Sequence, residues 1–264
     1  MIDRNRPAVI VLAGWLRETR EARGISLRTL AKRVGIHPST LSSIERGYQL
    51  AEIADVAHIV GSLGVHRKNR RRLEELVSQA SSLDLVGYSR REEQFLRAAY
   101  GERATHIVEW APSIIPEALQ TPDYARSLER VGLTNEAANV ERQMIRSSRQ
   151  LALTSDTRRR FTFYIGETAT RPDVCDAHTF DSQESHIDSL AQQGNVTVRR
   201  VSAAACPPGL IEPFTLYLCR SSAIAVAVPH HQNTVFVTTE AGLDNYLRTF
   251  RSLVLRASAT PPLT

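Results

Sequence analysis

The sequence predicts two domains of different fold class: a mainly α domain of five helices at the N-terminal end and an α+β domain after it. Apolar residues recur three and four positions apart through the first 80 residues, whereas after residue 160 they alternate with polar ones. A chain of 264 residues is long enough for two compact domains. We assign residues 1–84 and 85–257 to these domains and residues 258–264 to a disordered tail.

Three glycines separate the first helices. The first helix is expected to end at Gly24, and Ser26 caps a second, short helix that ends at Gly35. Pro38 suits the first position of a third helix, which is expected to end at Gly47. Two short helices joined by a tight glycine turn meet the requirements of a helix-turn-helix unit.

Two more helices complete the predicted N-terminal core. Their apolar stripes are Ile53, Val56, Ala57 and Val60 in the fourth helix, and Leu73, Leu76, Val77 and Ala80 in the fifth. A basic run at residues 66–72 lies between these helices or opens the last one. The five helices are expected to share one small core.

The second domain is expected to follow a short connection at residues 84–87. Helices are predicted over residues 90–103, from Thr121 and Pro122 onward, over 135–151, around 185–193 and over 243–257. Strands are predicted around residues 161–165, 196–201, 214–218, 224–228 and 235–237. The mixture of five strands with flanking helices predicts an α+β architecture.

Basic residues are concentrated in the first domain. Residues 1–72 contain 14 Lys and Arg against 6 Asp and Glu, whereas the remaining residues contain 19 against 22. Such a division is typical of a protein that binds a polyanion through its basic part, because phosphate neutralisation with counterion release supplies most non-specific affinity. A basic surface that only serves solubility is the alternative.

The composition argues against a membrane protein and a disulfide scaffold. The longest apolar runs, residues 8–16 and 223–228, are shorter than the roughly 18 to 20 residues that cross a bilayer. Cys175, Cys206 and Cys219 show no close pairing, which fits free thiols in a reducing compartment. No export signal is recognisable. We expect a cytoplasmic protein without a membrane contact.

Three segments, residues 23–27 (RGISL), 30–35 (LAKRVG) and 41–47 (LSSIERG), resemble the lambda-repressor-like, or Xre, family of helix-turn-helix proteins. In that family the third helix enters the major groove of double-stranded DNA, and the second helix crosses the backbone. The resemblance therefore implies DNA as the polyanion. It also implies a buried ion pair between Arg20 and Glu45 that holds the first helix to the third.

The resemblance assigns DNA contacts to seven side chains. Ser39, Ser42 and Ser43 are expected at base edges, and Ser26, Arg28, Thr40 and Arg46 at phosphates. Serines cannot make the bidentate base contacts that discriminate by roughly 1 to 3 kcal/mol each, so we expect modest specificity. His37 stands where the family often has Ser or Thr, which are better helix caps.

A second resemblance concerns the rest of the chain. Its residues are 110–126 (WAPSIIPEALQTPDYAR), Glu167, Arg171, Pro172, 195–198 and 213–215. They resemble a signature of actinomycete two-domain regulators of the WhiJ-like, antitoxin-like type, which implies a small partner protein encoded nearby. Glu117 and Ala118 depart from the family, which usually has glycine and leucine there.

Metal and catalytic chemistry are weaker alternatives. Zinc-ligand residue types gather at Asp173, Cys175, Asp176, His178, His186, His230 and His231, but no second short-spaced pair completes a site. Glu167 and Asp173 are candidates for an acid and base pair, with Tyr164 and Arg171 as helpers, but isolated acidic residues in a loop are more often solvated or paired with arginine. No glycine-rich phosphate loop is present. We predict no catalytic residue, no metal and no cofactor.

The sequence thus predicts a sequence-specific transcriptional regulator, a homodimeric repressor whose second domain senses a small partner protein or a small-molecule ligand that the sequence does not name. An antitoxin-like protein that neutralises a small partner and regulates its own operon is the alternative. A ligand-processing enzyme fused to a DNA-binding domain is the third.

Overall fold

The computed structural model describes residues 6–79, 84–87, 89–130, 139–155, 157–170, 174–203, 210, 212–230 and 233–259. The chain forms two compact units, one of Met1–Arg103 with Pro229–Leu243 and one of Ala104–Val228 with Asp244–Thr264. A helical N-terminal part followed by a mixed part of helices and strands confirms the predicted fold classes. The domain boundaries at residues 84 and 85 stay predictions.

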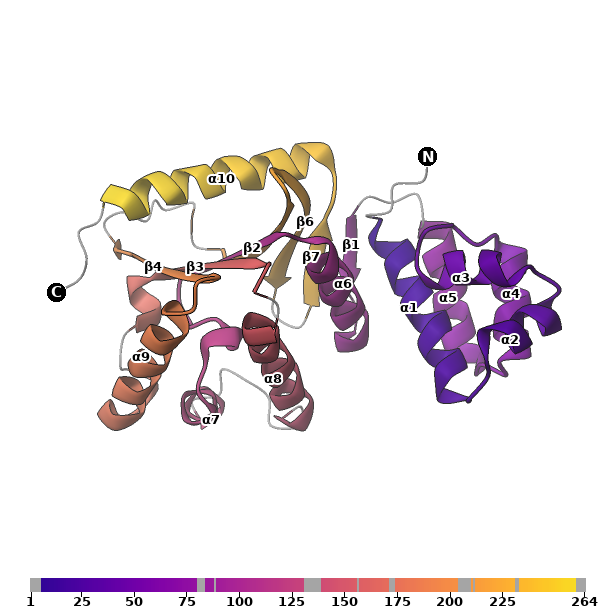
Figure 1. Ribbon diagram of the computed structural model, residues 1–264, viewed down its shortest axis with the longest axis horizontal. Helices are drawn as coiled ribbons and strands as arrows, with labels where there is room; N and C mark the ends of the chain where they lie inside the picture. The colour runs from indigo at the N-terminus through magenta and orange to yellow at the C-terminus, as the bar shows by residue number, and fades with distance from the viewer. Residues whose placement is uncertain are drawn as a thin grey trace. The chain divides into compact units, whose positions relative to one another are not determined.

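The first unit contains the five predicted helices (Figure 1): α1 (Pro7–Ala22), α2 (Leu27–Val34), α3 (Pro38–Glu45), α4 (Ile53–Ser62) and α5 (Arg67–Ser78). The glycine stops are confirmed, because Gly24, Gly35 and Gly47 have φ angles of 62°, 76° and 66°. These positive values are accessible to glycine with little strain. The basic run at residues 66–72 opens the fifth helix.

Most of the predicted apolar stripes are buried in this unit. Val56 and Val60 of α4 and Leu73 of α5 are each 1% exposed. Ile53 is an error in the stripe, because 59% of it is exposed. Side chains of a helix point toward its N-terminus. Ile53 is the first residue of α4, so no earlier turn of this helix lies beneath its side chain. Ala80 lies outside the described residues.

Helix α6 (Arg90–Arg103) has the predicted bounds and packs in the first unit. It lies against α1, where a Cβ added to Gly14 would approach the Phe95 ring to 2.8 Å. Leu96 is buried as predicted, and Tyr100 is also buried, with its ring stacked on Phe236 at 6.0 Å between centroids. The helix therefore completes the core of the first unit.

Residues 84–87 form a strand rather than the predicted connection. This strand, β1 (Asp84–Gly87), pairs antiparallel with β7 (Asn233–Val237). The prediction is wrong here because four residues carry almost no periodic pattern, and the strand depends on a partner far along the chain.

The second unit is built on a mixed sheet in the strand order β6 (Ser222–His230), β5 (Phe214–Cys219), β2 (His106–Ala111), β3 (Arg160–Gly166) and β4 (Val196–Val201). Strands β2, β3 and β4 are parallel, and β5 is antiparallel to both of its neighbours. The carboxyl ends of the three parallel strands consequently meet at one edge of the sheet.

The central strand β2 was not predicted from the sequence. Its six residues include the polar side chains of His106 and Glu109, which weaken the strand pattern, although Val108 and Trp110 are buried. Hydrogen bonds to β3 on one side and to β5 on the other hold it in place. Such a strand is determined by its neighbours more than by its own propensity.

Helices cover both faces of this sheet (Figure 1). Three of them, α7 (Pro122–Arg130), α8 (Asn139–Ser155) and α9 (Ala177–Ala191), lie on one face, and α10 (Glu240–Ala259) lies on the other. Tyr246 and Phe250 of α10 contact the rings of Phe214 and Tyr164 edge-on. Helix α10 therefore covers its face of the sheet with aromatic contacts.

Several helix bounds differ from prediction. Helix α9 begins at Ala177, earlier than expected, because the Asp176 side chain accepts a hydrogen bond from the Thr179 N–H at 2.8 Å and caps it. Helix α8 continues to Ser155, and α10 to Ala259. The predicted start of α8 at residues 135–138 and the last tail residues, 260–264, lie outside the described residues.

Candidate nucleic-acid interface

The unit formed by α2 and α3 depends on a tight turn and a small residue. Gly35 ends α2 in the left-handed conformation, and the N–H groups of Gly35 and Ile36 donate to the Ala31 carbonyl at 3.0 and 3.1 Å. Ala31 of α2 and Leu41 of α3 are fully buried, and the two helices pack against each other. The turn and the short side chain let the two helices cross closely, as a helix-turn-helix requires.

Both helices begin with side-chain caps. The Ser26 hydroxyl accepts a hydrogen bond from the Thr29 N–H at 3.1 Å, as predicted for the cap of α2. The His37 ring caps α3, because its Nδ1 accepts from the Ser39 N–H at 3.3 Å and lies 2.6 Å from the Ser39 hydroxyl. A histidine cap therefore engages the first of the serines that we expect at base edges.

The predicted DNA contacts lie on accessible parts of α2 and α3. Ser26, Arg28, Ser39 and Arg46 are exposed, and Thr40, Ser42 and Ser43 are half-buried. The Arg46 Nε donates to the Ser42 carbonyl at 3.2 Å, which holds the arginine beside the end of α3. The seven side chains thus come from α2, α3 and the residues that cap them, and their contacts with DNA stay predictions.

The implied ion pair between Arg20 and Glu45 is present and buried. The Arg20 Nε and Nη2 donate to the two carboxylate oxygens of Glu45, each at 2.8 Å. The hydrogen bond to Glu45 raises the pKa of the Arg20 guanidinium. A third bond runs from Arg20 to the Ile25 carbonyl at 3.0 Å. This arginine therefore ties the end of α3 to α1 and to the turn before α2.

An aromatic residue next to this surface was missed from the sequence. Tyr48 follows α3 and is 47% exposed, and the Arg46 guanidinium lies 5.2 Å from the centre of its ring. A large exposed aromatic beside a basic residue is a common feature of interaction surfaces. Its position directly after the glycine that ends a reading helix is the signal that would have found it.

The basic run that opens α5 is largely engaged in ion pairs. Arg70 pairs with Glu74 at 3.1 Å and Arg71 with Glu75 at 3.3 Å, both on the exposed side of the helix. Arg72 reaches α6, where Glu92 is 3% exposed and accepts two bonds from the guanidinium at 2.8 and 3.0 Å. At least Arg72 therefore has a structural role, which reduces the charge that this run offers to a polyanion.

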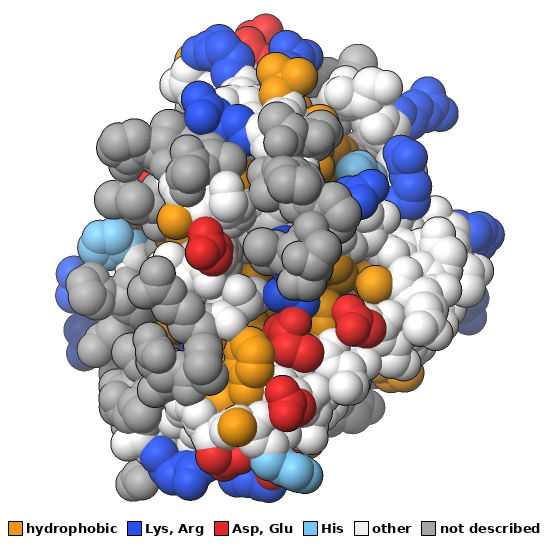
Figure 2. All heavy atoms as spheres, turned by 90° about the vertical axis from the view of Figure 1, so that its left-hand side faces the viewer, with side chains coloured by type: hydrophobic (Ala, Val, Ile, Leu, Met, Phe, Trp, Pro, Cys, Tyr) orange, Lys and Arg blue, Asp and Glu red, His pale blue; other side chains and the backbone are white. Residues whose placement is uncertain are grey.

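The face of the molecule in Figure 2 carries side chains of both signs. Acidic side chains gather near the middle of this face, and basic ones lie mainly toward its edges. The described side chains of this face therefore do not form a continuous basic surface. Its acidic groups would repel phosphate. The accessible side chains that we expect to contact DNA lie on α2, on α3 and at the residues that cap them.

Two acidic residues of the second unit that were candidates for metal binding or catalysis make structural contacts. Asp176 caps α9, and the Glu167 carboxylate accepts a hydrogen bond from the Ala203 N–H at 2.7 Å. No three His, Cys, Asp or Glu side chains among the described residues are grouped so that they can hold a metal ion. Arg171, Asp173, Cys206 and His231 lie outside the described residues.

Comparison with protein families assigns both parts of the chain. Residues 16–67 match the family model of a helix-turn-helix. Residues 96–262, more than half of the chain, match the family described as a domain of unknown function, DUF5753. The chain belongs to the DUF5753 family.

In this DUF5753 chain the helix-turn-helix match includes α2 and α3, so the expected Xre-like unit is confirmed and the protein is a DNA-binding regulator. Neither a curated protein nor a solved structure matches the chain. Within the part that the structure describes, no helix combines the length and apolar character needed to cross a membrane. The WhiJ-like and antitoxin-like subtype stays a prediction.

Proposed function

We propose that the protein is a cytoplasmic, homodimeric repressor that binds its operator through α2 and α3 and responds through its second unit to a small partner protein or a ligand. The observation that carries this proposal is the pair of helices α2 and α3, joined by a glycine turn and held by the buried pair of Arg20 and Glu45. Ser39 in α3 and Arg46 directly after it are exposed. A rigid pair of this kind presents one helix to the major groove.

The homodimer follows from the geometry of DNA. A single short helix reads few base pairs, and two copies that bind half-sites one helical turn apart, roughly 34 Å, double the contacted sequence. The reading side chains are serines, each of which makes weaker base contacts than arginine or glutamine. Two half-sites and phosphate contacts together would then supply the affinity.

The sequence resemblance at residues 110–126 supports a small partner protein, as in antitoxin-like regulators. A neighbouring gene whose toxicity this protein relieves would support the antitoxin version. We propose a non-catalytic second unit, since the described Glu167 carboxylate is bound to the backbone at Ala203. Turnover of a metabolite that is lost in Glu167→Gln would contradict that proposal.

DNA binding is tested with the full chain and two duplexes, its own upstream region and a scrambled sequence, by fluorescence anisotropy over a salt series. We expect the native duplex to bind more tightly. Ser39→Ala/Ser43→Ala is expected to remove that preference, because base contacts specify. Arg46→Ala is expected to weaken both duplexes and to reduce the slope of log affinity against log salt by about 1, because one phosphate contact is lost.

Arg126→Ala is the matched control for loss of one arginine. Arg126 is an exposed residue of α7 in the second unit and pairs with Asp123. This variant is expected to bind both duplexes like the parent protein. Equal affinity of the parent for both duplexes, or an Arg46→Ala variant with an unchanged salt slope, would contradict the assigned roles.

A further inference from the structure

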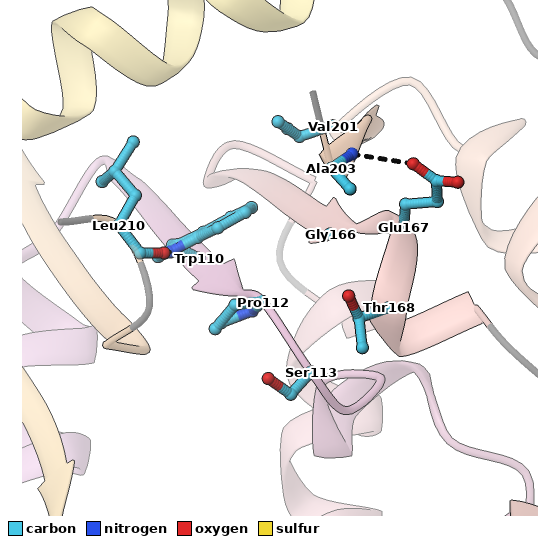
Figure 3. A pocket seen from close by; sticks show the side chains of 9 residues that line it. All are labelled: Trp110, Pro112, Ser113, Gly166, Glu167, Thr168, Val201, Ala203 and Leu210. Carbon is cyan, nitrogen blue, oxygen red and sulfur yellow. Dashed lines mark hydrogen bonds between the residues drawn. The ribbon is translucent and has the colours of Figure 1, made fainter. Parts of the chain in front are cut away.

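A cavity of about 160 Å³ lies in the second unit, at the carboxyl ends of the parallel strands β2, β3 and β4. Figure 3 shows its walls, which come from residues that end or follow these strands and from Leu210, which precedes β5. Pro112 and Ser113 follow β2, Glu167 and Thr168 follow β3, and Ala203 follows β4. In sheets with parallel strands, ligands bind preferentially outside the carboxyl ends of those strands.

Three contacts fix the shape of this cavity. The Trp110 indole N–H donates to the Leu210 carbonyl at 3.0 Å, and Glu167 accepts from the Ala203 N–H at 2.7 Å. Gly166 lies so close to the loop that follows β2 that an added Cβ would be 2.4 Å from the Pro112 carbonyl oxygen. Glycine at this position therefore lets two of the walls approach each other. A cavity held in this way is largely formed before any ligand arrives.

The segment after β2 is held from the helical side as well. Gln183 of α9 is fully buried, and its amide donates to the Leu119 carbonyl and accepts from the Thr121 N–H, each at 2.7 Å. Gln150 of α8 donates to the Gln120 carbonyl at 2.7 Å. Two helices thus anchor residues 119–121, at the end of the segment that follows β2 and carries Ser113.

The inner and outer parts of the cavity differ in chemistry. The inner part is apolar and buried, with Trp110 and Val201 each 1% exposed and Leu210 5% exposed. The outer part carries the exposed hydroxyl side chains of Ser113 and Thr168. A molecule that fits both parts has an apolar body and a hydrogen-bonding end.

Charge limits the class of molecule further. The described residues that line the cavity include one charged side chain, Glu167, which is negative. Its carboxylate accepts a hydrogen bond from the backbone of Ala203, which makes it part of the cavity wall. Its negative charge repels anions. A phosphate or carboxylate would find no Lys or Arg among the described lining residues. The volume is below the roughly 300 to 1,000 Å³ of pockets for drug-sized ligands, so the molecule is small.

We propose that this cavity, lined by Trp110, Ser113, Thr168, Val201, Ala203 and Leu210, binds a small uncharged organic molecule whose flat apolar body lies against Trp110 and whose hydroxyl or carbonyl end bonds to Ser113 and Thr168. This cavity is then the ligand site of the second unit. Any effect of the ligand on operator affinity rests on the proposed function, whereas the binding itself does not.

The test uses the full chain without DNA, so its failure is distinct from a failure of operator binding. The protein is labelled with ¹⁵N-tryptophan, and the indole N–H signals of its two tryptophans are followed by NMR. Trp15→Phe assigns the Trp110 signal, because Trp15 lies in α1 of the other unit. The probes are 2-phenylethanol, phenylacetate and 2-phenylethylamine, which share a ring and differ in charge.

We expect 2-phenylethanol to shift the Trp110 signal in a saturable way and to bind at least tenfold more tightly than phenylacetate. Ala203→Phe fills the cavity from an exposed position and is expected to weaken binding at least tenfold. Thr168→Val removes one hydroxyl and is expected to weaken binding roughly fivefold, the effect of one hydrogen bond. Thr197→Val, at an exposed position of β4 outside the cavity, is the matched control and is expected to bind like the parent.

Two results would overturn the proposal. A Trp110 signal that none of the three probes shifts, or a shift that persists unchanged in Ala203→Phe, shows that the cavity is not the site. Tighter binding of phenylacetate or 2-phenylethylamine than of 2-phenylethanol overturns the uncharged ligand class.

Discussion

A single buried charged pair holds α3, the helix that we propose to read DNA, to α1. The Arg20 side chain is 11% exposed and that of Glu45 is 3% exposed, and two hydrogen bonds of 2.8 Å join them. Burial of charges is costly, and attraction with good geometry offsets that cost only while both partners are present. The pair also removes Glu45 from the surface, where a carboxylate beside Arg46 would repel phosphate.

We expect Glu45→Gln to lower the free energy of unfolding by about 3 kcal/mol, because it leaves the Arg20 charge buried without its counterion. Urea denaturation followed by circular dichroism measures the change. Glu74→Gln is the matched control, since its pair with Arg70 is 47% and 45% exposed and is worth below about 0.5 kcal/mol. Similar losses in the two variants would refute the structural role of the buried pair.

At the scale of elements, the turn between α2 and α3 is the joint of the DNA-binding unit. Its glycine, Gly35, has a φ of 76°, and the next helix begins three residues later at Pro38 under the cap of His37. A residue with a side chain is strained in this left-handed conformation. The sequence signals of this element are local, which explains why its bounds were predicted within two residues.

Two glycine-to-alanine changes are expected to act in opposite directions. Gly35→Ala places a side chain at a positive φ and is expected to destabilise the first unit by about 1 to 2 kcal/mol. Gly61→Ala lies inside α4 with no atom within 4 Å of the added Cβ, and is expected to stabilise it by about 0.5 to 1 kcal/mol. Thermal melts of both variants measure the two changes in stability, and a lower melting temperature for Gly61→Ala would contradict its position inside a helix.

For the molecule as a whole, two half-buried histidines of the second unit, His106 and His186, are expected to couple stability to pH. Burial, and then the charge of Arg160, lower the pKa of His106, whose Nε2 lies 2.9 Å from the Thr162 hydroxyl. Burial also lowers the pKa of His186, whose Nε2 has no hydrogen-bond partner among the described residues. Below the ordinary histidine pKa of about 6.5, the unfolded chain binds protons that the folded chain does not.

Stability is therefore expected to fall as pH falls from 7 to 5, since the unfolded state binds more protons in that range. The double variant His106→Gln/His186→Gln is expected to show a smaller fall, whatever its stability at pH 7. Urea midpoints at three pH values measure the slope. An equal slope in parent and variant would mean that other groups take up the protons.

The framework of the helix-turn-helix is the part of the molecule that the sequence predicted best. Ser26 as a cap, the three glycine stops and the Arg20 and Glu45 pair all have local or family-specific signals, and the structure confirms them. Tyr48 was missed because an aromatic residue in a loop has no periodic pattern. The cavity was missed because its walls come from residues near positions 110, 166, 201 and 210, which only the fold brings together.

The sequence by itself determined helices α2 and α3 and their ends, because a helix makes its hydrogen bonds within a few residues and its caps and apolar stripe lie in the same segment. Tertiary structure alone decided the strands β1 and β2, the membership of α6 in the first unit, and the meeting of three loops at one sheet edge. Strand pairing joins residues that are distant in the chain, so a short strand such as β1 gains its hydrogen bonds only when its partner arrives.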